Sequence, residues 1–220
     1  LALGQIEKLV QLYEKNGVNG AFICGSTGEG VALTFKEKKQ VMAAWGKVKS
    51  PKLQKIFMVG GTCLKEMQSL AKYAQKNKMD AISMLCPYYF KPANLERLVD
   101  FCSEVAKAAP NLPFYYYHIP VLAGGHFSML EFLKLAEKQI PNLAGIKYTY
   151  SDIMDYQKCR AYKKGKYQLL WGIDEALLSG LAAGAKGGVG STYNYAAPLY
   201  NNIIKAFNEG NIKEASRLQD

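Results

Sequence analysis

The sequence predicts an α/β fold, and within that class a (β/α)8 barrel, or TIM barrel, from three observations. Apolar runs alternate with amphipathic segments of helical periodicity along the whole chain. The runs are apolar at nearly every position, which is typical of parallel strands buried on both faces. Polar side chains follow most of the runs, as in barrels, whose sites are assembled from the loops after the strands. An open nucleotide-binding sheet is the competing architecture, but the chain contains neither G-x-G-x-x-G nor G-x-x-x-x-G-K-S/T.

The strands are expected in seven short runs bounded by residues that favour turns. Because a helical segment follows each run, we expect parallel pairing with right-handed crossovers. The expected strands are residues 20–24, 56–60, 81–86, 114–117, 143–147, 168–171 and 187–190.

The helices are expected between these strands, and two of them begin at recognisable signals. Thr34 with Glu37 has the spacing of a capping box, as has Ser128 with Glu131. The expected helices cover residues 5–16, 34–49, 65–77, 94–108, a segment from 128, 152–162, 174–183, 198–208 and a segment from 211.

The first expected element of the sequence is the helix at residues 5–16, and we expect no strand before it within these residues. We therefore expect residues 1–220 to form a single barrel domain holding strands two to eight, with a C-terminal helical extension beginning near residue 198. On this interpretation the chain is a fragment that lacks the first strand and further C-terminal helices. A barrel without one strand has unpaired backbone edges, so we expect this span by itself to be insoluble or inactive.

The composition argues against nucleic-acid-binding, membrane-spanning and metal-binding classes of protein. The net charge of +10 raises the possibility of a nucleic-acid-binding module, but the basic residues are spread along helical segments rather than clustered. The five cysteines are odd in number and lack C-x-x-C spacing, which favours reduced thiols and a cytoplasmic location. No apolar run reaches the roughly 18 residues that span a bilayer. His118 and His126 have no partners at metal-ligand spacing, so we expect neither a metal site nor a membrane or nucleic-acid partner.

Lys147 is the most informative residue, because it ends the apolar strand at 143–147. A buried ammonium is costly unless it is paired or loses its proton. A lysine in a dry pocket has a lowered pKa and becomes a neutral amine that can attack a ketone. The alternative is that Lys147 lies just past the strand and reaches water.

Other polar side chains follow the remaining strands, and each has a simpler interpretation when seen alone. Asp174 and Glu175 could be the acidic first turn of a helix. The Tyr117 side chain could simply pack in the core between strands. Strand alternation also puts Tyr115 on the same face, so the face alone does not single out Tyr117. The side chains at the strand ends are Ser26, Thr27, Tyr88, Tyr89, Tyr117, Lys147, Thr149, Asp174, Glu175, Ser191 and Thr192, with Gly172 beside them.

Four motifs in order at barrel spacing resemble the pyruvate-dependent class I aldolases, the family of N-acetylneuraminate lyase and dihydrodipicolinate synthase. They are Gly25-Ser-Thr-Gly-Glu29, Tyr117-His-Ile-Pro120, Gly145-Ile-Lys147 and Gly188-Val-Gly-Ser191, and the resemblance covers essentially the whole chain. Gly172-Ile-Asp-Glu175 and Gly190-Ser-Thr-Tyr-Asn194 are similar to the neuraminate branch, whereas no Arg follows Pro120 as is usual in the synthase branch. His118 departs from the Asn that is common at its position.

The resemblance implies a Schiff-base aldolase that cleaves N-acetylneuraminate reversibly to N-acetylmannosamine and pyruvate. It implies that Lys147 is the nucleophile, that Tyr117 carries protons, and that no cofactor is needed beyond the covalent Schiff base. It also implies a homotetramer and a weaker role for Tyr89 at a neighbouring site. The substrate-binding residues that it implies are Ser26, Thr27, Thr149, Gly172, Asp174, Glu175 and Ser191.

Three alternatives remain open at this point. The chain could be a sister aldolase that acts on a 2-keto-3-deoxy sugar acid or 4-hydroxy-2-oxoglutarate, or the synthase itself. It could be a non-catalytic ligand-binding barrel, although such a protein has no need of an amine nucleophile. A nucleic-acid-binding module would show steeply salt-dependent affinity for polyanions.

Overall fold

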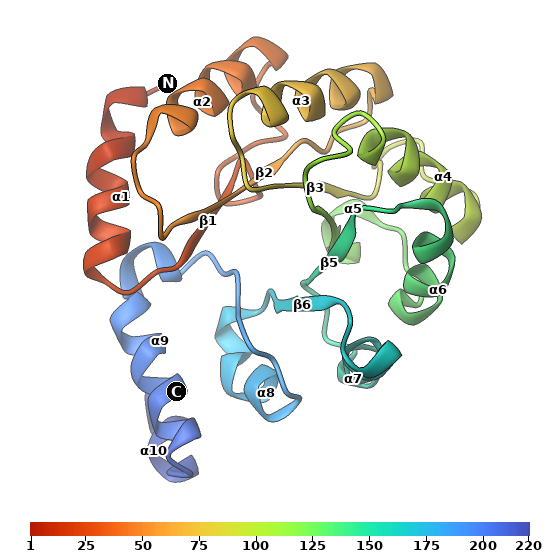
Figure 1. The fold of residues 1–220 in the computed structure, drawn as a ribbon. Coiled ribbons are helices and arrows are strands. Elements are labelled where there is room, and N and C mark those ends of the chain that lie inside the picture. The colour runs from red at the N-terminus through yellow and green to blue at the C-terminus, as the bar shows by residue number, and fades with distance from the viewer.

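Six parallel strands form one sheet that curls around a central axis in the computed structural model, which describes residues 1–220 (Figure 1). Their order in the sheet is their order in the chain, and every neighbouring pair is parallel. The curled parallel sheet confirms the α/β class and is consistent with part of a (β/α)8 barrel. The strands are β1 (Gly20–Ile23), β2 (Gln54–Met58), β3 (Ala81–Leu85), β4 (Phe114–His118), β5 (Leu143–Tyr148) and β6 (Gln168–Trp171).

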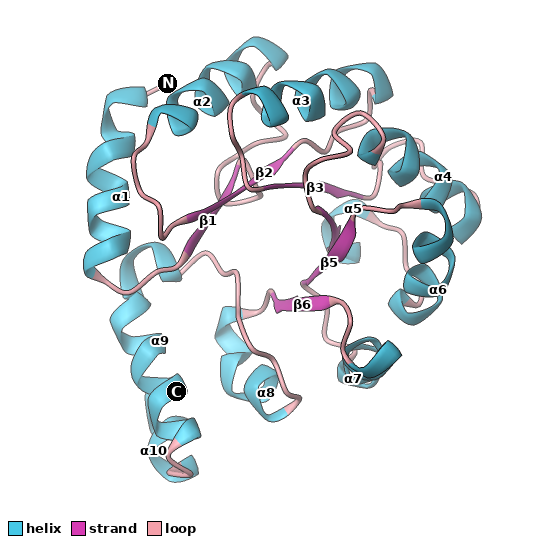
Figure 2. Ribbon diagram, viewed as in Figure 1, coloured by secondary structure: helices cyan, strands magenta, loops and turns pink.

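Helices surround the curled sheet on its outer face (Figure 2). Parallel neighbours cannot be joined by a tight turn, so each strand is connected to the next by a crossover. The α-helices are α1 (Ile6–Lys15), α2 (Phe35–Lys47), α3 (Leu64–Lys76), α4 (Leu95–Ala106), α5 (Pro120–Ala123), α6 (Met129–Gln139), α7 (Ile153–Ala161), α8 (Leu177–Ala182), α9 (Tyr193–Asn208) and α10 (Ile212–Gln219). Short 3-10 helices are η1 (Leu3–Gln5), η2 (Tyr162–Lys164) and η3 (Asp174–Ala176).

The helix starts follow the capping signals in the sequence. The side chain of Thr34 accepts a hydrogen bond from the backbone N–H of Glu37, and the Glu37 carboxylate accepts one from the N–H of Thr34. Ser128 accepts from the N–H of Glu131 at the start of α6. These bonds satisfy N–H groups that the first turn of a helix leaves without partners, so both predicted helix starts are confirmed.

Alternation along β4 and β5 separates an outer layer of the core from the interior of the curled sheet. Tyr116 of β4 stacks on Phe132 of α6 with ring centroids 4.6 Å apart, and Tyr148 of β5 meets Tyr156 of α7 at 5.4 Å. Successive side chains of a strand point to opposite faces. Tyr117, one residue beyond Tyr116, therefore points into the interior, and so does its partner in register, Lys147.

The predicted strand at 187–190 is wrong. Only one bridge forms there, between Trp171 and Gly188, through the bonds from Trp171 N–H to Gly187 O and from Val189 N–H to Trp171 O. The segment pairs on one side alone, and its glycines have no side chains to pack on a neighbour, which weakens a strand. The sheet therefore has six strands rather than the seven expected.

Helix α9 begins at Tyr193, earlier than the start expected near residue 198, and Pro198 lies inside it. Proline is tolerated because the backbone leaves helical geometry at Ala196, with φ −113° and ψ 15°. Asn201 of α9 donates from Nδ2 to the carbonyl of Asn16 at 2.9 Å, just after α1. The C-terminal end of the first helix therefore lies against the ninth helix (Figure 1).

Two helical segments differ from the prediction in detail. The short helix α5 was not predicted, and it begins on Pro120, a residue suited to the first helical position. The helix expected over 174–183 is divided into η3 and α8, because Ala176 adopts non-helical angles. Among all these helices, none combines the length and the apolar character needed to cross a membrane. All five cysteines are free thiols.

Candidate active site

Lys147 is buried inside the curled sheet, with only 7% of the residue exposed. Its Nζ lies 3.9 Å from the centroid of the Tyr117 ring and 4.2 Å from that of Phe22, and it forms no ion pair. Burial lowers the pKa of this amine to about 7, whereas the field of Asp174 acts in the opposite direction. An amine with such a pKa is largely unprotonated just above neutral pH, which is the state needed to attack a carbonyl carbon.

Tyr117 is the side chain next to Lys147 in the sheet register. Its hydroxyl lies 3.3 Å from Oγ of Ser26, close enough to share a hydrogen bond. Burial raises the pKa of Tyr117, although the hydroxyls of Ser26 and Thr149 act to lower it. The phenol is therefore neutral near pH 7 and can donate or accept a proton through a partner rather than act as a free base.

The loop after β1 carries Ser26 and Thr27, and both residues are exposed. The loop is tight, since a Cβ on Gly30 would lie 1.8 Å from the carbonyl oxygen of Cys24. Ser26 is linked to Tyr117 as described, whereas Thr27 makes no side-chain hydrogen bond. The two hydroxyls and the nearby backbone N–H groups are donors of the kind that bind a carboxylate.

Asp174 is 4% exposed at the start of η3, and one of its carboxylate oxygens accepts three hydrogen bonds. Oδ2 accepts from the Thr192 N–H at 2.8 Å, from Thr192 Oγ1 at 2.5 Å and from Ser191 Oγ at 3.3 Å. Burial acts to raise the pKa of Asp174, but these donors outweigh it, and the pKa lies below its ordinary value. The carboxylate is thus ionised and held in one orientation, with Oδ1 left free of hydrogen bonds.

Thr149 and Gly172 lie against each other beyond the ends of β5 and β6. A Cβ on Gly172 would lie 1.9 Å from Oγ1 of Thr149, so only glycine fits there. The Thr149 hydroxyl is buried and makes no hydrogen bond of good geometry. A buried donor without a partner is costly, so this hydroxyl is available to a bound ligand.

Three residues noted in the sequence make no side-chain hydrogen bond to this group. Glu175 is exposed and makes no side-chain hydrogen bond. Tyr89 is 84% exposed after β3 and contacts the ring of Phe90, so the structure does not bring it to Lys147. His118 is buried on the opposite face of β4, where burial lowers its pKa to about 4 and its ring lies 5.1 Å from that of Tyr148.

Two residues of the site were not assigned a role from the sequence. Phe22 contacts Lys147 Nζ, but the run around it is apolar throughout and does not show which face points inward. Thr192 belongs to the Gly190-Ser-Thr-Tyr-Asn194 motif, yet its two bonds to Asp174 depend on how the loop folds. The only sequence signal for Thr192 was its place in this motif. For Phe22 the only signal was the alternation of side chains along a strand, which does not by itself show which face points inward.

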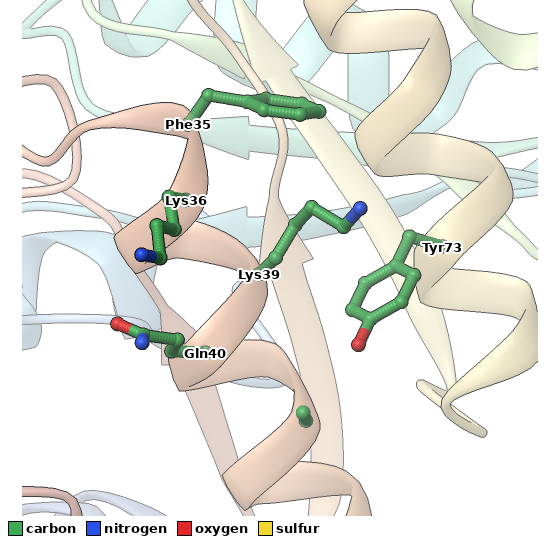
Figure 3. Close-up of a pocket in the computed structure, with 6 residues that line it drawn as sticks. Phe35, Lys36, Lys39, Gln40 and Tyr73 are labelled. Carbon is green, nitrogen blue, oxygen red and sulfur yellow. The ribbon is translucent and has the colours of Figure 1, made fainter.

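A separate groove of about 390 Å³ lies between α2 and α3 (Figure 3). Lys39 reaches across it, with Nζ 4.8 Å from the ring centroid of Tyr73 and 5.4 Å from that of Phe35. These contacts join the two helices, and none of the residues described above lines the groove. No group of three or more His, Cys, Asp or Glu side chains in the molecule is arranged to hold a metal ion.

Comparisons with known proteins identify the family of this chain. The model of the dihydrodipicolinate synthetase family matches residues 1–220. N-acetylneuraminate lyase A of Xenopus laevis is 41% identical over 219 residues, which is 99% of this chain and 72% of that protein. The solved N-acetylneuraminate lyases of Aliivibrio salmonicida and Proteus mirabilis are 38% and 36% identical, each with a TM-score of 0.96. This chain is covered completely in both superpositions, together with 73% and 74% of the two lyases respectively. The chain therefore belongs to the dihydrodipicolinate synthetase family.

Proposed function

We propose that this protein is a Schiff-base aldolase that cleaves N-acetylneuraminate reversibly to N-acetylmannosamine and pyruvate. The observation that carries the proposal is the buried, unpaired amine of Lys147 over the ring of Tyr117. The similarity to several N-acetylneuraminate lyases, at about 40% identity over nearly the whole chain, supports this substrate.

The reaction begins with Lys147. Its neutral amine attacks the C2 ketone of the open-chain sugar acid, a new C–N bond forms, and water leaves to give a protonated imine. The positive nitrogen then accepts the electron pair of the C3–C4 bond as that bond breaks. Burial supports the first step because it lowers the pKa of the amine to about 7.

Bond cleavage also requires that the C4 hydroxyl lose its proton, so that an aldehyde can leave. Tyr117 carries this proton, relayed through the hydroxyl of Ser26 or the carboxylate of the bound substrate. The product left on Lys147 is an enamine. It takes up a proton at C3, and water then hydrolyses the resulting imine to release pyruvate and the free lysine.

The remaining polar groups hold the two ends of the substrate. Ser26 and Thr27 bind the carboxylate of the keto acid through hydroxyl and backbone donors. Thr149, Asp174 and Ser191 bind the hydroxyls of the sugar chain, with Gly172 and Glu175 beside them. Because Asp174 is buried and ionised, its free oxygen rejects a substrate that offers no hydroxyl at that position.

We further propose that the protein works without a cofactor, in the cytoplasm, as a homotetramer. The imine nitrogen supplies the electron sink that a cofactor would otherwise provide. Exposed apolar side chains in the loop after β3 and on the short helix α5 support assembly, since soluble monomers rarely expose large apolar patches. They are Tyr89, Phe90, Val121 and Leu122. Light scattering on the purified protein tests this assembly, and a monodisperse monomer would contradict it.

Product analysis tests the proposed reaction. The full-length protein is incubated with N-acetylneuraminate, and the products are identified by chromatography and mass spectrometry, with Lys147→Met as the control. Equal amounts of N-acetylmannosamine and pyruvate are expected from the wild type and none from the variant. Cleavage only of a 2-keto-3-deoxy sugar acid or of 4-hydroxy-2-oxoglutarate would move the protein to a sister aldolase. Synthase activity with pyruvate would likewise identify the protein as a sister enzyme of the family. Binding of these compounds without turnover would identify the protein as a non-catalytic ligand-binding barrel.

A further inference from the structure

The Lys147 amine lies against two aromatic rings rather than beside an acidic group. The ring centroids of Tyr117 and Phe22 are 3.9 Å and 4.2 Å from Nζ, and the rings meet edge to face at 5.4 Å. Phe22 projects from β1 toward Nζ, and its ring also lies beside Gly25 in the loop that carries Ser26. Both distances are within the roughly 6 Å over which a cation is attracted to the face of a ring.

We propose that Phe22 is a catalytic residue whose ring face stabilises the positive charge on the Lys147 imine. The inference rests on the proposed Schiff-base function and adds a residue for which the sequence motifs suggested no role. It assigns Phe22 to the reacting nitrogen itself, whereas Ser26, Thr149 and Asp174 are assigned to the substrate.

The reaction makes two opposed demands on this nitrogen. It must be neutral to attack the ketone, and it must be positive in the imine to accept the electrons of the C3–C4 bond. Burial favours the neutral amine, but it destabilises the protonated imine for the same reason. A carboxylate in contact would stabilise the imine, yet it would also keep the resting lysine protonated.

An aromatic face meets both demands better than a carboxylate. Its attraction for a cation is weaker, and it has no lone pair that could remove the imine proton. The groups that face Lys147 fit this role. Tyr117 on β4 is a neutral phenol, Phe22 on β1 is uncharged, and Asp174 on η3 acts only through its field and is held by Thr192.

The loop after β1 leaves room for the ring. A Cβ on Gly25 would lie 2.8 Å from Cδ1 of Phe22, which is too close for two carbon atoms. Glycine at this position therefore allows the ring to keep its place against Lys147. The simpler interpretation is that Phe22 only fills space in the interior, and that interpretation predicts that the ring's shape matters while its electron density does not.

Fluorination separates the two interpretations, because it withdraws electron density from the ring with little change in shape. Phe22 is replaced in the full chain by 4-fluoro-, 3,5-difluoro- and 3,4,5-trifluorophenylalanine. The equilibrium constant for imine formation with pyruvate is then measured by borohydride trapping and mass spectrometry. We expect a stepwise fall that reaches about tenfold for the trifluoro variant, within the range known for desolvated cation–π contacts. The acid limb of imine formation should move to lower pH in the same order, because the ring also favours the protonated amine.

Three further variants complete the test. Phe22→Tyr keeps the ring face and should retain imine formation within about threefold of the wild type, whereas Phe22→Leu should lose about tenfold. Trifluorophenylalanine at Phe57, a fully buried ring on β2 that has no cation over it, should leave imine formation unchanged. Equal imine constants across the Phe22 fluorine series would overturn the proposal while leaving the aldolase function intact. Absence of any imine in the wild type would instead remove the proposed function itself.

Discussion

Replacing Lys147 by methionine is expected to stabilise the folded protein at neutral pH while it abolishes imine formation. The amine has a pKa of about 7 in the fold and an ordinary value of 10.5. This difference corresponds to a cost of about 5 kcal/mol for keeping a protonated lysine in the interior. Methionine has a similar length and no charge, so its variant does not bear that cost.

The gain from this substitution should depend on pH in a defined direction. Between pH 7 and 10.5 the unfolded chain binds more protons at this site than the folded chain, so the stability of the wild type rises with pH. Below about pH 7 Lys147 is protonated in both the folded and the unfolded protein, and the full cost of burying its charge lowers the stability of the wild type. The advantage of the variant is therefore largest at low pH, and it should shrink by about 2 to 3 kcal/mol between pH 6 and pH 9.

Urea unfolding followed by circular dichroism measures the free energy of unfolding of both proteins at each pH. Lys36→Met, at an exposed position on α2, controls for the loss of one positive charge. A difference between Lys147→Met and the wild type that stays constant from pH 6 to pH 9 would refute the reasoning. So would a variant that is less stable than the wild type at pH 6.

Three other substitutions test the site and the sheet. Tyr117→Phe removes the proton carrier and should lower kcat by about a hundredfold or more, while trapping of the pyruvate imine persists. Thr192→Val removes a 2.5 Å hydrogen bond to Asp174 and should raise the KM for the sugar acid about tenfold without changing pyruvate binding. Gly145→Ala places a Cβ 1.9 Å from the carbonyl oxygen of Gln168, so urea unfolding should show a loss of about 3 kcal/mol or more.

Each of these three predictions has an outcome that would contradict it or a control variant. Retention of kcat in Tyr117→Phe would show that another group carries the proton. For Thr192→Val, an equal loss of pyruvate binding would show a general disturbance of the loop rather than a role at the sugar end. Gly61→Ala is the control for Gly145→Ala, because a Cβ on Gly61 would meet nothing within 4 Å, and it should leave stability nearly unchanged.

The strand order and the position of Lys147 followed from the sequence because local patterns determine them. Continuous apolar runs separated by helical segments indicate parallel strands, and the carboxyl ends of such strands meet at one end of the sheet. Lys147 ends one run and Tyr117 ends the preceding run, and in the structure the two residues are partners in register.

The structure differs from the sequence-based prediction where an element depends on contacts between residues that are distant in the chain. The run at 187–190 looks like a strand by composition, but it finds a partner only at Trp171. Helix α9 extends back to Tyr193 because the chain bends at Ala196, which relieves the constraint of Pro198. Phe22 lies in a run without polar residues, so its inward orientation could not be recognised before the register was known.

Borohydride trapping tests the central claim most directly, which is that Lys147 forms the Schiff base. The full-length protein is incubated with pyruvate or with N-acetylneuraminate, reduced, digested and analysed by peptide mass spectrometry. We predict a reduced pyruvyl adduct on Lys147 with both compounds, and release of N-acetylmannosamine with the second. An adduct on any other lysine, or no adduct with either compound, would contradict the account.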